Sequence, residues 1–476
     1  MKLFNTLTRS TDELKPIATN SFGVYTCGPT VYDYAHIGHW YNYVRMDTLV
    51  RALQSAGNTV NWVMNITDVG HLVSDADDGE DKLEKGAKRE GKTAWEVAEF
   101  YTQDFLEAME LLNIQKPDHV VKATDHIAEQ IELIQRLEAK GYTYIIDDGV
   151  YFDTSKFEGY SAFAGLDLDE QQAGARVSIN DQKRNQADFA VWKFSPTDSQ
   201  RDMEWDNPFG NGRKGFPGWH IECSAMSMKY LGESFDIHTG GIDHIPVHHT
   251  NEIAQSEAAT GKRFANYWMH SNHVTVNGEK ISKSLGNGIR LQEIIAKGIS
   301  AEAVRLNILE SHYRSQSKFS WDSLEAAKNR LQHWQQVAVL VKQPQAASSA
   351  DNDAMLVQEL AAATSDIAAA LNDDLNTPVI LSRVDQALSV VEKQLISATS
   401  VQPFTKFLSY LEAVLGINLL LNLTELPQQV ATLLEARSTV RSAKDWAESD
   451  SLRDQLAELG YGVKDLPNGT TIWFKL

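Results

Sequence analysis

Two short runs of residues, far apart in the chain, contain side chains that could hold a nucleotide phosphate. The first runs from Cys27 to His39 and reads CGPTVYDYAHIGH, so that His36 and His39 flank Gly38. Imidazole N–H donors beside bare backbone suit a phosphate at a helix N-terminus, where free N–H groups and partial positive charge meet. Taken alone, two surface histidines in a loop explain this run equally well.

The second run reads KISKS at residues 280–284 and is followed by Leu285-Gly286-Asn287. Its lysines, Lys280 and Lys283, stand three residues apart in a segment flanked by glycine. Two such cations suit a triphosphate that gains negative charge while its α-phosphorus is attacked. The two runs together therefore predict chemistry on a nucleoside triphosphate.

A third group consists of residue types that bind a transition metal. His248 and Glu252 are four residues apart on a predicted helix, so both side chains leave the same face. Cys27 and Cys223 add two thiolates, and two thiolates, one imidazole and one carboxylate form a set that zinc accepts. His249 fits the spacing to Glu252 as well, and capping histidines with two buried thiols are the competing explanation.

A β-loop-α-β unit positions the first run. Residues 22–26 are β-prone, apolar residues at 46, 49, 50 and 53 follow helical spacing, and Gly57-Asn58 turns the chain into a second β-prone run at 59–64. Such units build parallel sheets, which bind ligands at the carboxyl ends of their strands. The sequence therefore predicts an α/β fold with the first run at that edge.

Composition bounds the remaining possibilities. The chain has 476 residues, a formal net charge of −20 and a pI near 5.1, which argues against nonspecific coating of nucleic acid. This length predicts two to four domains. No apolar run approaches the length of a membrane span, and Met1-Lys2-Leu3-Phe4 does not begin a signal peptide, so we expect a cytoplasmic protein. In that compartment a disulfide between the two cysteines is not expected.

Other segments give coarser expectations. Residues 86–93 match the phosphate-loop pattern GxxxxGK[ST], but the preceding charged residues cannot form the buried strand that such a loop needs, so we expect a solvated loop entering a helix. Thr377 and Pro378 are predicted to begin a helix. We expect the remaining elements as follows: helices over 96–141, a hairpin over 142–155, a strand at 235–238, a helix over 247–259, strands at 268–270 and 274–276, mostly helix after 290, a linker at 342–353, a helix over 430–460 and a β-turn-β element at 463–474.

HIGH followed by K-[MI]-S-K-S is the signature pair of class I aminoacyl-tRNA synthetases. Longer words around it resemble cysteinyl-tRNA synthetase: YTCGPTVYDYAHIGH, NITD at 65–68, AGARV at 173–177, DFAVWK at 188–193, GWHIECSAM at 218–226 and HHTNEIAQSEA at 248–258. The resemblance runs from the N-terminus to the last residues. It implies a Rossmann-type parallel-sheet catalytic domain with an α+β insertion, an all-helical domain and a small C-terminal α+β module.

The resemblance also implies domain boundaries. These are 1–125 and 206–275 for the two halves of the catalytic domain, 126–205 for the connective insertion, 276–340 for the KISKS loop and stem-contact region, 341–424 for the helical domain and 425–476 for the anticodon-binding module. Lys183-Arg184-Asn185 in the insertion could serve the acceptor end of tRNA, and a solvated turn explains it equally well.

The implied activity is ATP-dependent ligation of L-cysteine to tRNA(Cys) through cysteinyl-adenylate, with release of AMP and pyrophosphate by a monomer. One Zn²⁺ would select the cysteine thiolate and Mg²⁺ would accompany ATP. The resemblance favours His248 over His249 as a metal ligand. By role, the implied residues are His36, His39, Lys280 and Lys283 for catalysis; Pro29, Thr30, Gly38 and the same histidines and Lys283 for ATP; Trp219, Thr67 and His238 for cysteine; Cys27, Cys223, His248 and Glu252 for the metal; and Trp446, Asp450 and Asp465 for the anticodon.

The chain also departs from the family pattern. Tyr41 stands where an arginine usually follows HIGH, Thr250 replaces an acidic residue between the metal ligands, the signature KMSKS is KISKS, and Val69-Gly70-His71-Leu72 replaces a more acidic run. Two other classes of protein share parts of this pattern. A related small-molecule cysteine ligase lacks the far C-terminal module, which this chain keeps, and a catalytically silent tRNA-binding relative would not need complete HIGH, KISKS and metal sets.

Overall fold

The computed structural model describes residues 1–70, 81–165, 180–197, 201–210, 212–281, 285–345, 350–420, 426–465 and 471–476. Lys283 and the AGARV segment lie outside the described residues. The chain divides into two compact units. The first comprises Met1–Ala301, His312–Phe319 and Asp373–Leu375, and the second comprises Glu302–Ser311, Ser320–Asn372 and Asn376–Leu476.

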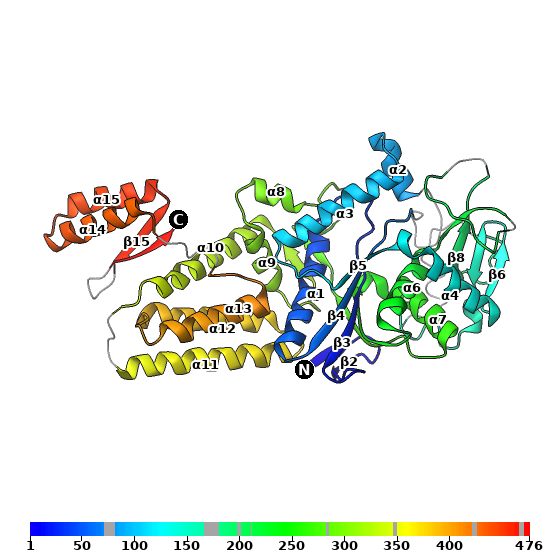
Figure 1. Ribbon diagram of the computed structural model, residues 1–476, viewed down its shortest axis with the longest axis horizontal. Helices are drawn as coiled ribbons and strands as arrows, with labels where there is room; N and C mark the ends of the chain where they lie inside the picture. Colours follow the sequence, from blue (N-terminus) through cyan, green and yellow to red (C-terminus); the bar gives the residue numbers. More distant parts are fainter. Residues whose placement is uncertain are drawn as a thin grey trace. The chain divides into compact units, whose positions relative to one another are not determined.

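A five-stranded sheet forms the centre of the first unit (Figure 1). All of its neighbouring strands are parallel, which confirms the predicted α/β fold. The strand order is β11 (Ala265–Ser271), β10 (Phe235–Gly241), β3 (Ser21–Thr26), β4 (Thr59–Ile66) and β5 (His119–Lys122). The chain moves outward from β3 to β5 and then returns beside β3 at β10. The strand order therefore reverses between β3 and β10, the place where open parallel sheets bind ligands.

The predicted β-loop-α-β unit is confirmed as β3, α1 (Ile37–Ser55) and β4, with Gly57 at a φ of +86° in the turn. The short strand β5 falls inside a stretch that was expected to be helical, so that expectation is wrong at this point. The other helices of the unit are α2 (Lys82–Glu90), α3 (Ala94–Leu111), α4 (Ile127–Ala139), α6 (Trp219–Leu231), α7 (Thr250–Thr260) and α8 (Leu291–Ala296).

The segment that matches the phosphate-loop pattern consists of the end of helix α2, a turn and the cap of helix α3. Gly86 lies within α2, Gly91 ends that helix at a φ of +66°, and Thr93 caps α3 by accepting a bond from the Glu96 backbone. No strand precedes it within residues 81–85, so rejection of the phosphate loop is supported. The expectation of a loop is wrong for residues 86–90, because they belong to helix α2, which Asp81 caps.

Smaller sheets flank the parallel one. The antiparallel order β6 (Thr143–Ile146), β7 (Gly149–Phe152), β8 (Phe189–Phe194) and β9 (Gly215–Pro217) includes the predicted hairpin and packs its apolar face with α4, α6 and α7. Strands β12 (Val274–Val276), β13 (Glu279–Lys280) and β14 (Ser317–Phe319) form a second small sheet, and β1 (Lys2–Asn5) pairs with β2 (Ser10–Glu13). Short 3₁₀ turns occupy Ala123–His126, Thr154–Lys156 and Ile242–His244.

The second unit is mostly helical, as expected. Its helices are α9 (Ala301–Leu309, which begins in the first unit), α10 (Trp321–Ala338), α11 (Ala350–Asn372), α12 (Thr377–Gln394), α13 (Val401–Leu415), α14 (Gln428–Ser442) and α15 (Trp446–Glu458), with a 3₁₀ turn at Val339–Lys342. Helix α12 has Asn376 rather than Thr377 at its N-cap, one residue before the prediction. The single helix expected over 430–460 is two helices, which pack with the predicted hairpin of β15 (Tyr461–Asp465) and β16 (Thr471–Lys475).

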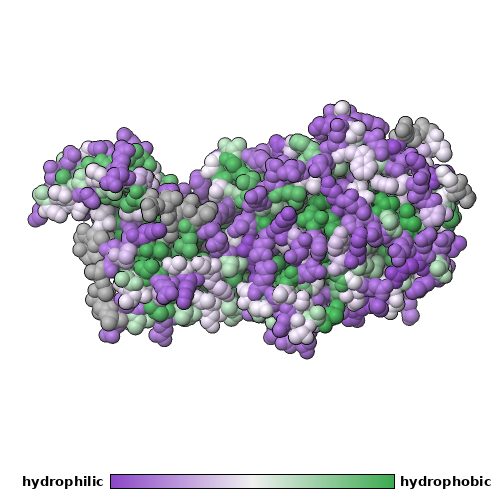
Figure 2. Space-filling view, in the orientation of Figure 1, coloured by the Kyte–Doolittle hydropathy of each residue, from purple (hydrophilic) through white to green (hydrophobic). Residues whose placement is uncertain are grey.

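One helix in the described part of the chain, Asp351–Asn372, is long and apolar enough to cross a membrane by length and composition. The sequence analysis did not anticipate it. Its buried residues Leu356, Leu360, Ala363 and Ile367 recur at helical spacing, and α11 packs against α12 and α13. A bundle helix meets the same criterion, so this helix is weak evidence for a membrane span. The face shown in Figure 2 is predominantly hydrophilic, in keeping with 23% charged residues.

Candidate active site

The HIGH histidines cap the helix on which they lie. Nδ1 of His36 accepts a bond from the Gly38 N–H (3.1 Å), and Nδ1 of His39 accepts one from the His36 N–H (3.0 Å). Because both Nδ1 atoms accept, each neutral ring carries its proton on Nε2. The two rings lie 3.9 Å apart between centroids. The N-terminus of α1 therefore has two adjacent imidazoles, each with an Nε2–H donor, which suits a phosphate oxygen.

The charge state of His39 follows from burial. Desolvation, with the neighbouring His36 as the second cause, lowers the pKa of His39 to about 3. His39 is thus neutral at physiological pH and acts as a hydrogen-bond donor rather than as a cation. A Cβ on Gly38 would lie 2.9 Å from His36 Cε1 and 3.1 Å from Ile281 Cδ1, so a larger residue here would displace the His36 ring.

The segment after β3 runs along the end of β4. The Thr67 N–H donates to the Pro29 carbonyl (3.0 Å), and the Val31 N–H donates to the Thr67 carbonyl (3.2 Å). Upstream, a Cβ on Gly28 would lie 1.6 Å from the Asn65 carbonyl oxygen, so only glycine allows this approach. The structure therefore brings Pro29, Thr30 and Thr67 together, although the Thr67 side chain itself is buried.

The KISKS segment begins on β13, where Lys280 is exposed. Asn287 Nδ2 donates to the Lys280 carbonyl (3.1 Å), which brings the chain before and after residues 282–284 together. The Ile37 N–H at the start of α1 donates to the Ile289 carbonyl (2.8 Å). The structure thus brings the Lys280 end of KISKS to the HIGH helix, and the role of Lys283 stays a prediction.

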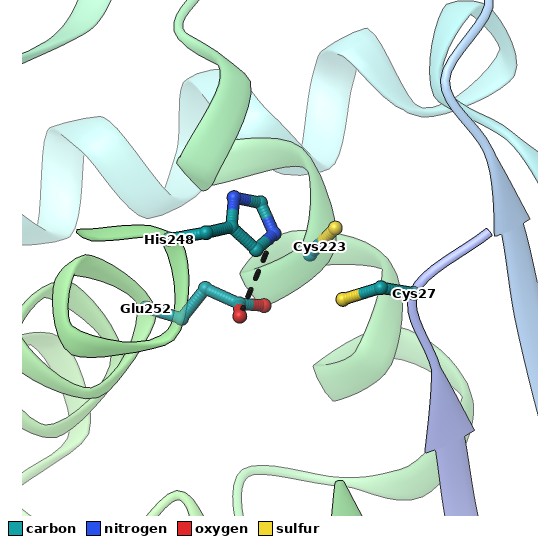
Figure 3. A group of neighbouring side chains, drawn as sticks. All are labelled: Cys27, Cys223, His248 and Glu252. Atoms are coloured by element: carbon teal, nitrogen blue, oxygen red, sulfur yellow. Dashed lines mark ion pairs between the residues drawn. The ribbon is translucent and has the colours of Figure 1, made fainter. Parts of the chain in front are cut away.

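The four proposed metal ligands come together from four elements (Figure 3). Cys27 follows β3, Cys223 lies on α6, His248 lies on the π-helical turn Ile245–His249, and Glu252 lies on α7. All four are buried, and their ligand atoms lie within 4.8 Å of one another. His248 Nε2 is 3.6 Å from Glu252 Oε2. The group lies where the strand order reverses, since the Cys27 N–H donates to the Thr239 carbonyl of β10 (3.2 Å).

A second set of four overlaps the first. Cys27, His238, His249 and Glu252 also lie within 4.8 Å of one another. His249 Nε2 is 3.4 Å from Cys27 Sγ, and His238 Nε2 is 3.1 Å from Glu252 Oε1. The ambiguity between His248 and His249 seen in the sequence therefore persists in space. Only the first set contains both cysteines, the softest donors, so it is the set that suits zinc best.

The thiols are free and held neutral in the protein alone. Burial, followed by Cys223 and Glu252, raises the pKa of the Cys27 thiol well above its ordinary value. For Cys223 a hydrogen bond with Cys27 lowers the pKa, but burial and Glu252 raise it by more. Two buried thiols facing a carboxylate and an imidazole form a donor set that a divalent metal would deprotonate and satisfy. The residues present therefore fit a metal ion.

Further rings surround the cluster. Trp219 packs on His248, with ring centroids 4.5 Å apart, and its role in binding cysteine stays a prediction. His238 is fully buried and stacks on Trp268. The sequence analysis missed three nearby histidines. These are His220, His244 and His270, whose rings lie beside His248 or His249.

The anticodon candidates lie in the C-terminal module. Trp446 is 56% exposed, with the Arg441 guanidinium 5.4 Å from its ring centroid. The Asp465 carboxylate, by contrast, accepts two bonds of 2.8 Å from Arg437. Asp450 forms an exposed ion pair with Arg453 (3.2 Å). The structure thus presents Trp446 and Asp450 to solvent and gives Asp465 a structural pairing.

Comparison with protein families gives two matches that fit this arrangement. The family described as "tRNA synthetases class I (C) catalytic domain" matches residues 13–329, and "Cysteinyl-tRNA ligase anticodon binding domain" matches residues 423–472. A cysteine–tRNA ligase of Treponema denticola is 43% identical, with 100% of both chains covered. The chain belongs to the cysteinyl-tRNA synthetase family. The resemblance seen in the sequence is confirmed, and the chain has the activity of a cysteine–tRNA ligase.

Other comparisons agree with the family. Cysteine–tRNA ligase 1 of Burkholderia lata is 45% identical over 99% of this chain and 97% of its own length. Among solved structures, the chain is similar to Mycobacterium tuberculosis methionyl-tRNA synthetase bound to methionyl-adenylate (TM-score 0.57, 17% identity, 83% of this chain, 89% of that one). It is also similar to a LeuRS of Agrobacterium radiobacter (TM-score 0.59, 12% identity, 86% and 85%). These two structures support the class I fold alone.

Proposed function

We propose that this member of the cysteinyl-tRNA synthetase family forms cysteinyl-adenylate from L-cysteine and ATP at the HIGH and KISKS segments. It then transfers the cysteinyl group to tRNA(Cys). The observation that supports this most directly is that one loop, residues 27–36, joins Cys27 of the metal cluster to His36 of the phosphate-binding helix end. A group bound at the cluster and a nucleotide bound at α1 are thereby held by the same short segment.

In the first step an oxygen of the cysteine carboxylate attacks the α-phosphorus of ATP. A new O–P bond forms, the bond to the β-phosphate oxygen breaks, and pyrophosphate leaves. The carboxylate is already ionised, so no general base is required, and positioning and electrostatics supply the rate. The Nε2–H groups of His36 and His39 bind phosphate oxygens, while Lys280 and Lys283 balance the charge of the leaving pyrophosphate. Mg²⁺ accompanies the ATP.

Cys27, Cys223, His248 and Glu252 would hold a zinc ion beside the adenylation site. When bound, zinc supplies a soft centre for the substrate thiolate, which the alcohol of serine cannot match at neutral pH. Selection by metal is needed because an apolar pocket separates near-isosteres by only about 10²-fold. Trp219, packed on His248, walls the substrate side of the cluster, with His238 and Thr67 as further contacts.

In the second step a hydroxyl of the terminal ribose of tRNA attacks the adenylate carbonyl and AMP leaves. The C-terminal module, residues 425–476, binds the anticodon, with Trp446 as a stacking surface and Asp450 as a polar contact. The insertion at 126–205 handles the acceptor end, where the Arg184 guanidinium lies 4.2 Å from the Tyr144 ring centroid. The domain boundaries given in the sequence analysis, a cytoplasmic location and a monomeric state complete the proposal.

Exchange of labelled pyrophosphate into ATP tests the first step. The full chain is compared in zinc-loaded and metal-stripped forms, with cysteine or serine as substrate. We expect exchange with cysteine alone, and only in the metal-loaded form. Equal exchange with serine would contradict selection by zinc. Absence of exchange from a folded, zinc-loaded sample would contradict the proposed adenylation.

A further inference from the structure

Arg45 joins the helix that carries the HIGH histidines to strands that lead into the KISKS segment. It lies on α1 and is 3% exposed. Its Nη1 donates to Ser271 Oγ (2.7 Å) and to the Asn272 carbonyl (3.1 Å), and its Nη2 donates to Ser317 Oγ (2.5 Å). One buried guanidinium therefore binds three oxygens that belong to two separate segments of the chain.

Those oxygens lie at the beginning of the small sheet β13-β12-β14. Ser317 is the first residue of β14 and pairs with Val274 of β12. The next residue of β12, Thr275, pairs with Lys280 of β13. Pairing fixes the register of neighbouring strands. The backbone position of Lys280 therefore depends on where Arg45 holds the first residues of this sheet.

The first turn of the same helix contacts the same region. Ile281 Cδ1 lies 3.1 Å from the point where a Cβ on Gly38 would be, and the Ile37 N–H donates to the Ile289 carbonyl (2.8 Å). Arg45 follows Gly38 by two helical turns. Helix α1 thus contacts the KISKS segment near the histidines and the strands β11 and β14 at Arg45.

We propose that Arg45 is a positioning residue for the adenylation step, holding Lys280 at a fixed place relative to His36 and His39. The proposal rests on the proposed function. A planar guanidinium suits the task because its fixed fork of donors spans oxygens on two strands, whereas a lysine ammonium is a single point. The Tyr41 ring, 5.2 Å from the Arg45 guanidinium carbon, supports it from one helical turn earlier.

The contact with Arg45 also gives a role to Tyr41, a residue at which this chain departs from the family pattern. Tyr41 stands where the family usually carries an arginine after HIGH. In this chain Tyr41 lies against Arg45, and the Arg45 guanidinium is directed into the β11–β14 junction. Tyr41 thereby helps to hold the guanidinium that joins α1 to these strands.

The test compares R45Q and R45K with the wild-type full chain, loaded with zinc. Cysteine-dependent pyrophosphate exchange gives kcat and the KM for ATP, and equilibrium binding gives the affinity for cysteine. We expect kcat to fall about 10- to 100-fold in R45Q, which is the scale of a small misplacement of a catalytic group. The kcat of R45K should lie between those of the wild type and R45Q. The affinity for cysteine should not change in either variant, because the metal cluster is built from other elements.

A double-mutant cycle with K280A separates positioning from general stability. If Arg45 acts through Lys280, R45Q combined with K280A will exchange no more slowly than K280A alone. The matched control is R51Q, since Arg51 is 6% exposed on the same helix and donates to Asp47 (2.7 Å) and to the Asn113 carbonyl (2.8 Å) instead. R51Q should retain wild-type exchange per folded molecule. The pair S271A and S317A removes two acceptors while Arg45 stays, in case R45Q does not fold.

Three results would overturn the positioning role while leaving the proposed function standing. The first is a wild-type exchange rate both in R45Q and in the variant pair S271A and S317A. The second is an equal loss of exchange in R45Q and R51Q. The third is a loss in R45Q that adds fully to the loss caused by K280A. Absence of exchange in the wild-type protein would instead overturn the proposed function, and this proposal with it.

Discussion

The Nδ1 atoms of His220 and His248 lie 2.9 Å apart in the buried cluster, so one ring must donate to the other. A proton on His248 Nδ1 leaves its Nε2 as a lone-pair donor, the atom that lies 3.6 Å from Glu252. In the arrangement with His248 as the donor, His220 holds the tautomer that a metal requires. Such outer partners orient a ligand and raise its affinity.

Replacing His220 should therefore weaken metal binding without removing a ligand. We expect H220Q to raise the zinc Kd about 10- to 100-fold, the usual effect of losing an outer partner, as measured by competition with a chromogenic chelator. The control is H126Q, which removes a buried histidine that is bonded to the Lys122 carbonyl (2.6 Å). Unchanged affinity in H220Q, or the same loss in both variants, would show that His220 does not orient His248.

The C-terminal module should depend on the charge of Asp465. A hydrogen bond from Arg437 is the largest cause that lowers the pKa of this carboxyl to about 2, from an ordinary 3.8. A carboxyl whose pKa is lower in the folded state stabilises the fold at pH values above its unfolded-state pKa. This contribution is lost as the pH falls through its folded-state pKa. We expect D465N to speed hydrogen exchange of the β15–β16 amides at pH 7, with the difference from wild type shrinking between about pH 4 and pH 2.

Asp450 supplies the matched control for that prediction. Its carboxylate is 61% exposed and pairs with Arg453, and exposed pairs contribute little to stability. D450N should leave hairpin exchange unchanged at both ends of the pH range. A D465N difference as large at pH 2 as at pH 7, or an equal effect of D450N, would contradict the structural pairing of Asp465 with Arg437.

Trp446 should act on tRNA binding and not on adenylation. Its ring is exposed, and stacking of a base on an aromatic ring contributes about 1–3 kcal/mol, so W446A should raise the KM for tRNA about 5- to 150-fold. Pyrophosphate exchange should stay at the wild-type rate. L459A, which truncates another exposed apolar side chain of the module, serves as the control. A loss of exchange in W446A, or an unchanged KM, would remove Trp446 from anticodon recognition.

Local signals account for the parts of the fold that the sequence predicts well. Helix α1 has its own capping residues in His36 and His39 and a continuous buried face, and β3 and β4 are apolar runs on either side of it. Strand β5 has only four residues, and its pairing with β4 is set by distant contacts, so propensity missed it. Helix α2 was missed because its cap, Asp81, stands among many other charged residues.

The site shows the same division. The ligand types were readable from the sequence, but the choice between His248 and His249 was not. Both spacings bring a histidine to the same face as Glu252, and the two Nε2 atoms lie 3.6 and 3.7 Å from its carboxylate. The structural role of Asp465 was not readable from the sequence, because its partners Arg437 and Arg441 approach it only through tertiary packing.

The central claim is that this chain selects cysteine and delivers it to tRNA. The most direct measurement is aminoacylation of tRNA(Cys) by the zinc-loaded full chain, with labelled cysteine and serine supplied together. We expect cysteinyl-tRNA to form and seryl-tRNA not to form. Acylation by serine, or cysteine-dependent pyrophosphate exchange without any acylated tRNA, would contradict it.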